Sequence, residues 1–152
     1  MNKLITLLLA LVLCPLTLSA QGKRYHGDGI DNVLEYVPLV ATFTLKGCGV
    51  ESASSWKRLA VDGAFSIGIT AGTTYLLKHT INDMRPDRTD NHGFPSGHTA
   101  VAFCGARMLD KEFRHVSPWI SVAGYTVATV TAVDRVRRNR HHWDDVVVGE
   151  PP

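Results

Sequence analysis

Three short segments in the second half of the chain carry side chains suited to binding and attacking a phosphate group. The first segment ends at Pro86 and holds two cations, Lys78 and Arg85, seven positions apart. Seven residues make about two helical turns, so both cations can lie on one face of a helix that Pro86 then ends. The alternative is an ordinary helix end with a lysine and an arginine in solvent.

The second segment is the turn Pro95-Ser-Gly-His98, which leads directly into a helix-forming sequence. Backbone N–H groups at the start of a helix favour an anion, and Ser96 adds a hydroxyl donor beside the Gly97 amide. His98 can donate or accept a proton near neutral pH. The same residues can form a serine–glycine turn with a capping histidine, so this segment alone does not decide the function.

The third segment centres on His141, which follows Arg135 by six positions and precedes Asp145 by four. Residues four apart meet on one face of a helix. A carboxylate bonded to one imidazole nitrogen fixes the tautomer and leaves the other nitrogen as nucleophile or base. The alternative is a solvated basic loop attracted to anionic lipid. The clustered histidines could also suggest zinc, but the usual spacing of cysteine and histidine ligands is missing, so we expect no metal.

Together the three segments resemble the signature of the phosphatidic acid phosphatase type 2 superfamily, which also contains bacterial acid phosphatases and vanadium haloperoxidases. That signature reads K-x6-R-P, then P-S-G-H, then S-R-x5-H-x3-D. The spacings match over 68 residues, from Lys78 to Asp145. The matching residues are Lys78, Arg85, Pro86, Pro95, Ser96, Gly97, His98, Arg135, His141 and Asp145.

The resemblance implies a role for each of these residues. His141 corresponds to the nucleophile that forms a phosphohistidine, Asp145 to the group that orients it, and His98 to the general acid that protonates the leaving oxygen. Phosphoryl transfer depends mainly on positioning and charge stabilisation, which three side-chain cations can supply without a cofactor. The expected phosphate cradle consists of Lys78, Arg85, Ser96, Gly97 and Arg135.

Two features depart from the family pattern. Asp134 stands where the signature has serine, and a carboxylate there would repel phosphate unless it points away or pairs with an arginine. After Asp145 only a short stretch precedes Pro151 and Pro152, where the family usually continues with a long helix. We therefore expect a final helix that frays, and a chain that could be truncated.

The elements that must position these residues are predicted to be helices, because no stretch alternates with period two for long enough to require a strand. The expected fold is an all-α bundle of the acid phosphatase and haloperoxidase type, with about five helices. They cover residues 30–45 with a bend at Pro38, 59–77, 99–109, 118–133, and a short segment from residue 142. Residues 83–94 are predicted to be a loop, and the predicted helix caps are Ser52 or Ser54 and Ser117.

The first twenty residues are typical of a signal peptide, with a positive start, an apolar run over residues 4–13 and small residues up to Ala20. An uncleaved membrane anchor is the alternative reading. Cleavage after Ala20 would leave one exported domain, residues 21–152. Two cysteines would remain, Cys48 and Cys104, which we expect to be buried thiols rather than a disulfide.

The composition excludes several classes of protein. Hydrophobic residues make up 45% of the chain and charged residues 20%, which excludes a disordered tail. A formal charge of +2 is too near neutral for a dedicated nucleic-acid binder. Long uncharged stretches, such as residues 116–133, favour association with a membrane, although a core helix of a small bundle looks the same.

These observations predict a metal-independent phosphatase acting outside the cytoplasm, either at the membrane with the site facing the periplasm or free in the periplasm. The apolar helices and the basic run of residues 135–140 favour an anionic lipid substrate: phosphatidic acid, phosphatidylglycerol phosphate, undecaprenyl diphosphate or lipid A. One alternative is a soluble periplasmic acid phosphatase that acts on small phosphate esters with broad specificity. Another is a truncated, inactive remnant that binds phosphate. A haloperoxidase is less favoured, because those enzymes are usually much longer.

Overall fold

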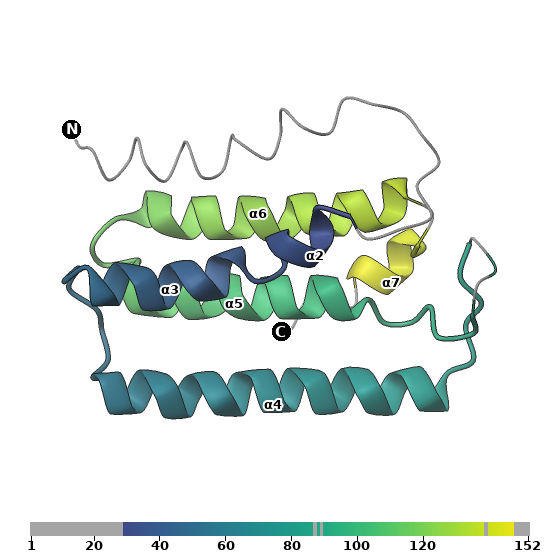
Figure 1. Cartoon of the computed structure of the whole chain (residues 1–152), viewed down its shortest axis with the longest axis horizontal. Helices are drawn as coiled ribbons and strands as arrows, with labels where there is room; N and C mark the ends of the chain where they lie inside the picture. The colour runs from purple at the N-terminus through teal and green to yellow at the C-terminus, as the bar shows by residue number, and fades with distance from the viewer. Residues whose placement is uncertain (1–28, 87, 89, 139, 148–152) are drawn as a thin grey trace.

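The computed structural model describes residues 29–86, 88, 90–138 and 140–147, which form helices joined by loops, with no β-strand in these ranges (Figure 1). The predicted all-α bundle is confirmed. The predicted signal peptide and the boundary at residue 20 lie outside the described residues. The helices are α2 (Asp31–Leu34), α3 (Val37–Gly47), α4 (Trp56–Thr80), α5 (Gly97–Phe113), α6 (Pro118–Arg137) and α7 (Trp143–Val147).

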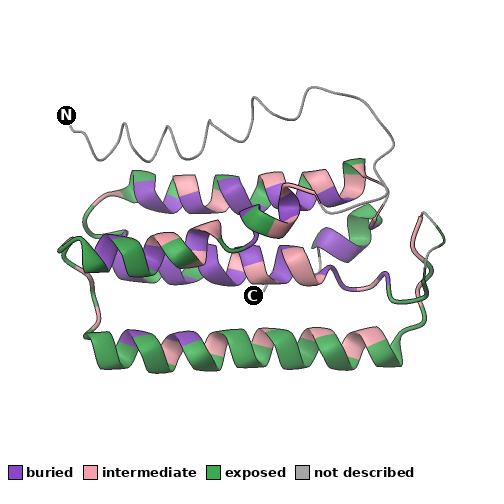
Figure 2. Ribbon diagram, viewed as in Figure 1, coloured by how far each residue is buried: buried purple, intermediate pink, exposed green. Residues whose placement is uncertain are grey.

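Helix α5 forms the centre of the bundle, because it packs against α3, α4 and α6 and most of its residues are buried (Figure 2). Small side chains at Ala102, Ala106 and Ala128 form a fully buried cluster between α5 and α6. An added Cβ at Gly105 would lie 2.8 Å from the backbone nitrogen of Leu39 in α3. Glycine is therefore needed for α3 and α5 to approach this closely.

The predicted helix over residues 30–45 is two helices, so the described residues contain six helices rather than about five. Pro38 does not bend a continuous helix but lies in the first turn of α3. A proline is tolerated there because the first N–H groups of a helix have no intrahelical partner. This break lets α2 stand apart from α3 and reach the end of the bundle where α6 finishes (Figure 1).

The helix caps were predicted only in part. Helix α4 is capped by Ser55, whose hydroxyl accepts a hydrogen bond from the backbone N–H of Arg58 at 3.3 Å. Ser54, one of the predicted caps, instead donates its backbone N–H to Glu112 Oε2 at 3.0 Å. Ser117 precedes α6 as predicted, but its side chain makes no cap hydrogen bond.

Both cysteines in the described part of the chain are free thiols. Cys104 is buried on α5, as predicted. Cys48 is exposed, and the prediction for it was wrong, because it follows the last turn of α3 at the surface of the bundle.

Helix α4 runs along one side of the bundle and is largely exposed (Figure 2). Its buried residues, Leu59 and Gly63, both lie near its N-terminal end. Lys111 Nζ on α5 also donates to Asp62 Oδ2 at 2.6 Å in that region. No described helix combines the length and the apolar character needed to cross a bilayer.

Candidate active site

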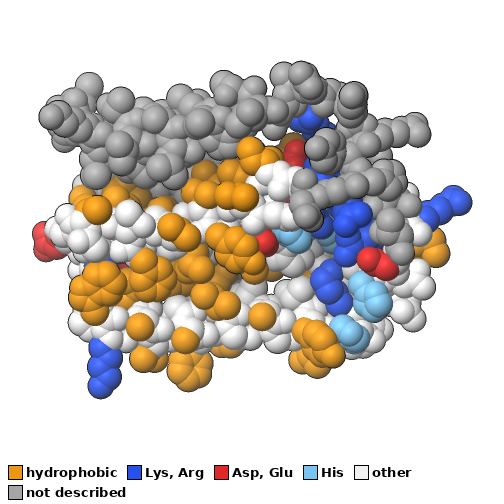
Figure 3. All heavy atoms as spheres, viewed as in Figure 1, with side chains coloured by type: hydrophobic (Ala, Val, Ile, Leu, Met, Phe, Trp, Pro, Cys, Tyr) orange, Lys and Arg blue, Asp and Glu red, His pale blue; other side chains and the backbone are white. Residues whose placement is uncertain are grey.

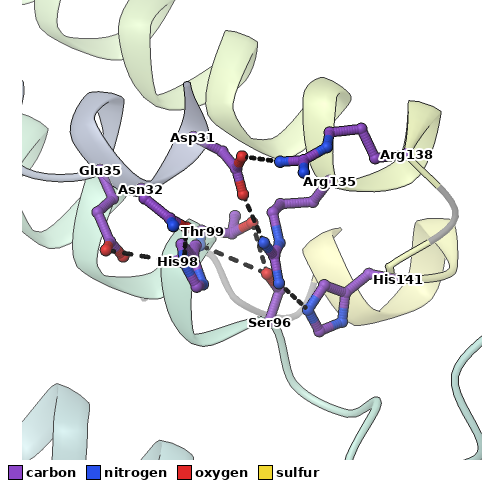
Figure 4. Close-up of polar contacts among 9 residues, drawn as sticks. All are labelled: Asp31, Asn32, Glu35, Ser96, His98, Thr99, Arg135, Arg138 and His141. Carbon is purple, nitrogen blue, oxygen red and sulfur yellow. Dashed lines mark hydrogen bonds and ion pairs between the residues drawn. The ribbon is translucent and has the colours of Figure 1, made fainter. Parts of the chain in front are cut away.

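The three sequence segments meet at one end of the bundle, where the last turn of α4, the first turn of α5, the end of α6 and α7 come together (Figure 1). Lysine, arginine and histidine side chains gather at this end, while apolar side chains cover much of the remaining face (Figure 3). Arg135 and Ser96 lie between His98 and His141 (Figure 4). Both histidines feel the positive charges of the three predicted cations, Lys78, Arg85 and Arg135.

Lys78 and Arg85 do not share a helix face, so that prediction was wrong. Helix α4 ends at Thr80, and Ile81 already has an extended backbone. Lys78 is thus in the last turn of α4, while Arg85 lies in the loop that follows. Pro86 was predicted to end the helix, but the helix ends at Thr80, more than one turn earlier.

The loop after α4 folds back on itself and holds both cations. An isolated bridge joins Asp83 and His92. Arg85 Nε donates to Asp90 Oδ1 at 2.8 Å, and Lys78 Nζ donates to the backbone carbonyl oxygen of His92 at 2.8 Å. Burial, followed by the charge of Arg85, lowers the pKa of Lys78. Such like-charged neighbours are a favourable setting for an anion.

Ser96 is buried at the start of α5 and fixes the predicted turn. Its hydroxyl oxygen accepts a hydrogen bond from Thr99 Oγ1 at 3.0 Å, so its own hydrogen can be donated to a ligand. The backbone N–H of Ser96 donates to the carbonyl oxygen of Asp145 at 3.0 Å, which joins this turn to α7. An added Cβ at Gly97 would lie 4.0 Å from Lys78 Cε, so the turn also borders the lysine.

His141 is held between Arg135 and Asp145. Arg135 Nη2 donates to His141 Nε2 at 3.3 Å, and His141 Nδ1 lies 3.5 Å from Asp145 Oδ2. An arginine can only donate, so Nε2 carries a lone pair and the proton of the neutral ring is on Nδ1. This is the tautomer that an attacking Nε2 requires.

His141 and Asp145 lie within ion-pair distance, as predicted, but His141 Nδ1 makes no hydrogen bond among the described residues. His141 also lies just before α7 rather than on it. Asp145 reaches back from the first turn of this helix, and its Oδ2 accepts the backbone N–H of His142 at 2.7 Å. This is the return contact of a capping box. Burial, opposed in part by that hydrogen bond, raises the pKa of Asp145.

Both histidines are uncharged near neutral pH. Burial, followed by the charges of Arg135 and Arg85, lowers the pKa of His141 to about 3. Burial, again followed by the charge of Arg135, lowers the pKa of His98 to about 4. A phosphate dianion bound among these cations would offset their repulsion and make both rings more basic.

Helix α2 contributes three polar residues that the sequence reasoning missed. Asp31 forms ion pairs with Arg135 and Arg138 (Figure 4). Asn32 Oδ1 accepts a hydrogen bond from His98 Nε2 at 2.9 Å. Glu35 Oε1 lies 3.8 Å from the same nitrogen. The available signal was three polar side chains in an otherwise apolar segment, with Glu35 three positions after Asn32 and four after Asp31, which are spacings that bring helical side chains together.

Among the described residues, Asp31 and His141 are partners of the Arg135 side chain, which the sequence predicts to lie beside the phosphate site. Its Nη1 pairs with Asp31 and its Nη2 contacts His141. Its Nε is buried and has no hydrogen-bond partner among the residues that the structure describes. Burial raises the pKa of Asp31, but the hydrogen bond and charge of Arg135 outweigh it, so the pKa is below its ordinary value.

Asp134, which replaces the serine of the signature, lies half-buried near the end of α6. Burial, followed by the negative charge of Asp31, raises the pKa of its carboxyl group, and Arg138 opposes this shift.

Within the described ranges, no three side chains of the histidine, cysteine, aspartate or glutamate type come together in a way that could hold a metal ion. The positive charge at this end of the bundle comes instead from lysine and arginine side chains.

Comparison with known families matches residues 59–150 to the PAP2 superfamily. The chain belongs to the PAP2 superfamily. A Lipid A 1-phosphatase from Porphyromonas gingivalis is 41% identical over 132 residues, which cover 83% of this chain and 30% of that relative. The PAP2 chain described here thus spans less than a third of the length of this curated relative. No solved structure gives a significant match to this chain.

Proposed function

We propose that this PAP2-superfamily chain is a phosphatase that hydrolyses a phosphomonoester or diphosphate of a membrane lipid through a phosphohistidine on His141. One observation carries the proposal: His141 presents an unprotonated Nε2 to Arg135 while its Nδ1 faces Asp145. A nucleophilic imidazole needs a lone pair on the attacking nitrogen and an acceptor for the proton on the other.

Phosphate binding would first exchange one contact of Arg135. The guanidinium donor Nη2 contacts the proposed attacking nitrogen, so the phosphate oxygens must take over this donor before Nε2 can reach phosphorus. The buried Nε offers a second donor on the same group. A guanidinium binds phosphate oxygens well in a two-donor geometry, and such charge-assisted bonds are about twice as strong as neutral ones.

The reaction then proceeds in two steps. In the first, a bond forms between His141 Nε2 and phosphorus, the bond from phosphorus to the leaving oxygen breaks, and His98 gives a proton to that oxygen. In the second, water attacks the phosphohistidine and gives its proton to His98, the bond from phosphorus to Nε2 breaks, and inorganic phosphate leaves. The cations Lys78, Arg85 and Arg135 stabilise the charge that spreads over the phosphate oxygens.

A lipid substrate is supported by the relative that is named a Lipid A 1-phosphatase and by the surface of α4. Four apolar residues spaced to share one face of this helix are exposed: Val61 (47%), Phe65 (68%), Ile69 (65%) and Leu76 (65%). The helix leads to Lys78 in its last turn, so acyl chains on this face would place a headgroup near the cations. We place the protein outside the cytoplasm, at the membrane with the site facing the periplasm.

The test is release of inorganic phosphate by the purified chain from lipid A, phosphatidic acid, phosphatidylglycerol phosphate and undecaprenyl diphosphate in mixed micelles. His141→Ala should abolish turnover and the labelled, acid-labile phosphoprotein of a rapid quench. His115→Ala, an exposed histidine outside the site, is the control and should retain both.

Other outcomes would overturn parts of the proposal. Turnover of small soluble esters but none of these lipids, with release from cells by salt or osmotic shock alone, would indicate a broad-specificity periplasmic phosphatase. Retained activity in His141→Ala would reject the nucleophile. No turnover by a folded, phosphate-binding chain would indicate an inactive remnant.

A further inference from the structure

We propose that Asn32 of α2 and Glu35, which directly follows this helix, are positioning residues for His98, holding its Nε2–H so that Nδ1 is directed at the phosphate site. This inference rests on the proposed phosphatase function for its consequence in catalysis. It does not rest on that function for the geometry, which two contacts to one ring nitrogen establish: 2.9 Å from Asn32 Oδ1 and 3.8 Å from Glu35 Oε1.

The contact to Asn32 determines the tautomer of His98. An amide oxygen only accepts hydrogen bonds, so Nε2 must carry the proton in the neutral ring and Nδ1 must carry the lone pair. The two nitrogens of an imidazole point in different directions. With Nε2 turned towards α2, Nδ1 is the nitrogen left to exchange protons with a substrate or with water.

The contact to Glu35 sets how readily His98 becomes positively charged. Glu35 is buried, with 7% of its surface exposed, and its neighbour Tyr36 also hydrogen-bonds to its carboxyl group. Burial raises the pKa of Glu35, because loss of solvent disfavours its charged form, and the hydrogen bond from Tyr36 opposes this shift. An anion at this position stabilises the imidazolium, the form of His98 that carries a proton on Nδ1 as well as on Nε2.

Positive and negative side chains from the surrounding elements act on His98. The groups that face it are Asp31 and Glu35 from α2, Lys78 from α4, Arg85 from the following loop and Arg135 from α6. The three cations disfavour the imidazolium, while the two carboxylates of α2 favour it. The carboxylates matter most in the first reaction step, when His98 must hold the proton that the leaving oxygen takes.

The direct test is nitrogen-15 NMR of the histidine rings in the full chain, whose mass is 16.6 kDa, with the His98 signals identified from their loss in His98→Gln. The intact protein should show a neutral His98 ring with the proton on Nε2. Asn32→Ala should convert it to a mixture of tautomers. Glu35→Gln should lower the pKa of His98, and Asn32→Asp, which keeps an acceptor and adds a charge, should raise it.

Glu51→Gln is the matched control, because Glu51 is exposed in the loop before α4, and it should leave the His98 signals unchanged. An unaltered Nε2–H tautomer in Asn32→Ala would overturn the role of Asn32. An unaltered His98 pKa in Glu35→Gln would overturn the role of Glu35. If Asn32→Ala does not fold, Asn32→Asp and Glu35→Gln still test the proposal, because they are expected to shift the pKa of His98 in opposite directions.

The catalytic consequence is tested with substrates that differ only in their leaving group. In Asn32→Ala, kcat should fall about tenfold or more for alkyl phosphates, whose leaving oxygen needs a proton, and much less for p-nitrophenyl phosphate. KM should stay within about twofold, and Asn32→Asp should restore most of the alkyl phosphate turnover. Equal losses for all leaving groups would reject positioning of the acid.

The two sets of measurements separate the two hypotheses. The NMR spectra report on the tautomer and pKa of His98 whether or not the protein turns over any substrate. A silent enzyme with the expected tautomer changes would refute the proposed function alone. An active enzyme without them would refute only the role assigned to α2.

Discussion

Asp31→Asn tests the ion pairs that join α2 to α6. Asp31 is fully buried (0% exposed), and Arg135, its partner, is only 4% exposed. The substitution keeps the size of the side chain but removes the negative charge that compensates the buried guanidinium. Breaking a buried pair by removing one partner costs about 3–5 kcal/mol of the free energy of unfolding. For a domain of this size the midpoint of thermal unfolding should fall by roughly 6–20 °C.

Urea and thermal unfolding, followed by the helical circular dichroism signal, measure this effect. Asp62→Asn is the matched control, because Asp62 pairs with Lys111 on the surface between α4 and α5, where loss of an ion pair has little effect. A loss in Asp31→Asn no larger than that in Asp62→Asn would refute the assignment of Asp31 as the anchor of Arg135.

The ion pair between Asp31 and Arg135 also predicts how the stability of the protein depends on pH. The pKa of Asp31 in the folded protein is below its ordinary value, so its contribution to stability is present above about pH 4. That contribution disappears as the pH falls through the folded pKa. The difference in stability between the native protein and Asp31→Asn should therefore shrink on acidification, and a difference that stays constant from neutral pH to pH 3 would contradict the ion pair.

Four further predictions concern the proposed reaction. His98→Ala should slow alkyl phosphates by about 10²–10⁴-fold and activated aryl phosphates far less, and a uniform loss would argue against an acid. Vanadate should inhibit competitively as a mimic of five-coordinate phosphorus, whereas full activity at about millimolar vanadate would count against the site. Activity should survive dialysis against EDTA, since the chain supplies its own cations, and its loss with recovery on adding a metal would reject metal independence. Binding of sulfate, a tetrahedral dianion that does not titrate near pH 6, should take up protons at that pH, measured by calorimetry in buffers of different ionisation enthalpy. The anion offsets the cations that, after burial, lower the pKa of His98 to about 4, and heats independent of the buffer would contradict this.

The sequence predicted the helical class, because that depends on local signals, and the resemblance to the family signature implied that the three segments form one site. Apolar periodicity indicated most of the helices, and the P-S-G-H turn indicated the start of α5. The spacing of His141 and Asp145 predicted their contact, which the structure shows. His141 is not in the helix, so a shared helix face is not the reason for this contact. The two side chains meet because Asp145 reaches back over the start of α7, where it accepts a hydrogen bond from the backbone N–H of His142.

The partners supplied by α2 could not be predicted in the same way. Asp31 and Arg135 are 104 positions apart, and no local pattern indicates which buried acid compensates which arginine. The place of Arg85 was also missed, because a helical spacing of seven was applied across Ile81, where the backbone is already extended. Long-range pairing and the exact end of a helix both depend on tertiary packing, which outweighs local preference.

The attachment of α4 has a consequence for the rate of the proposed reaction. Its buried residues end at Gly63, and fifteen residues of helix, about 22 Å, separate that point from Lys78. A tilt of about 3° would carry the ammonium group by about 1 Å, a displacement that can reduce turnover about 100-fold. Detergent or lipid that coats the outward side of this helix could thus alter kcat from a distance, without contacting the phosphate.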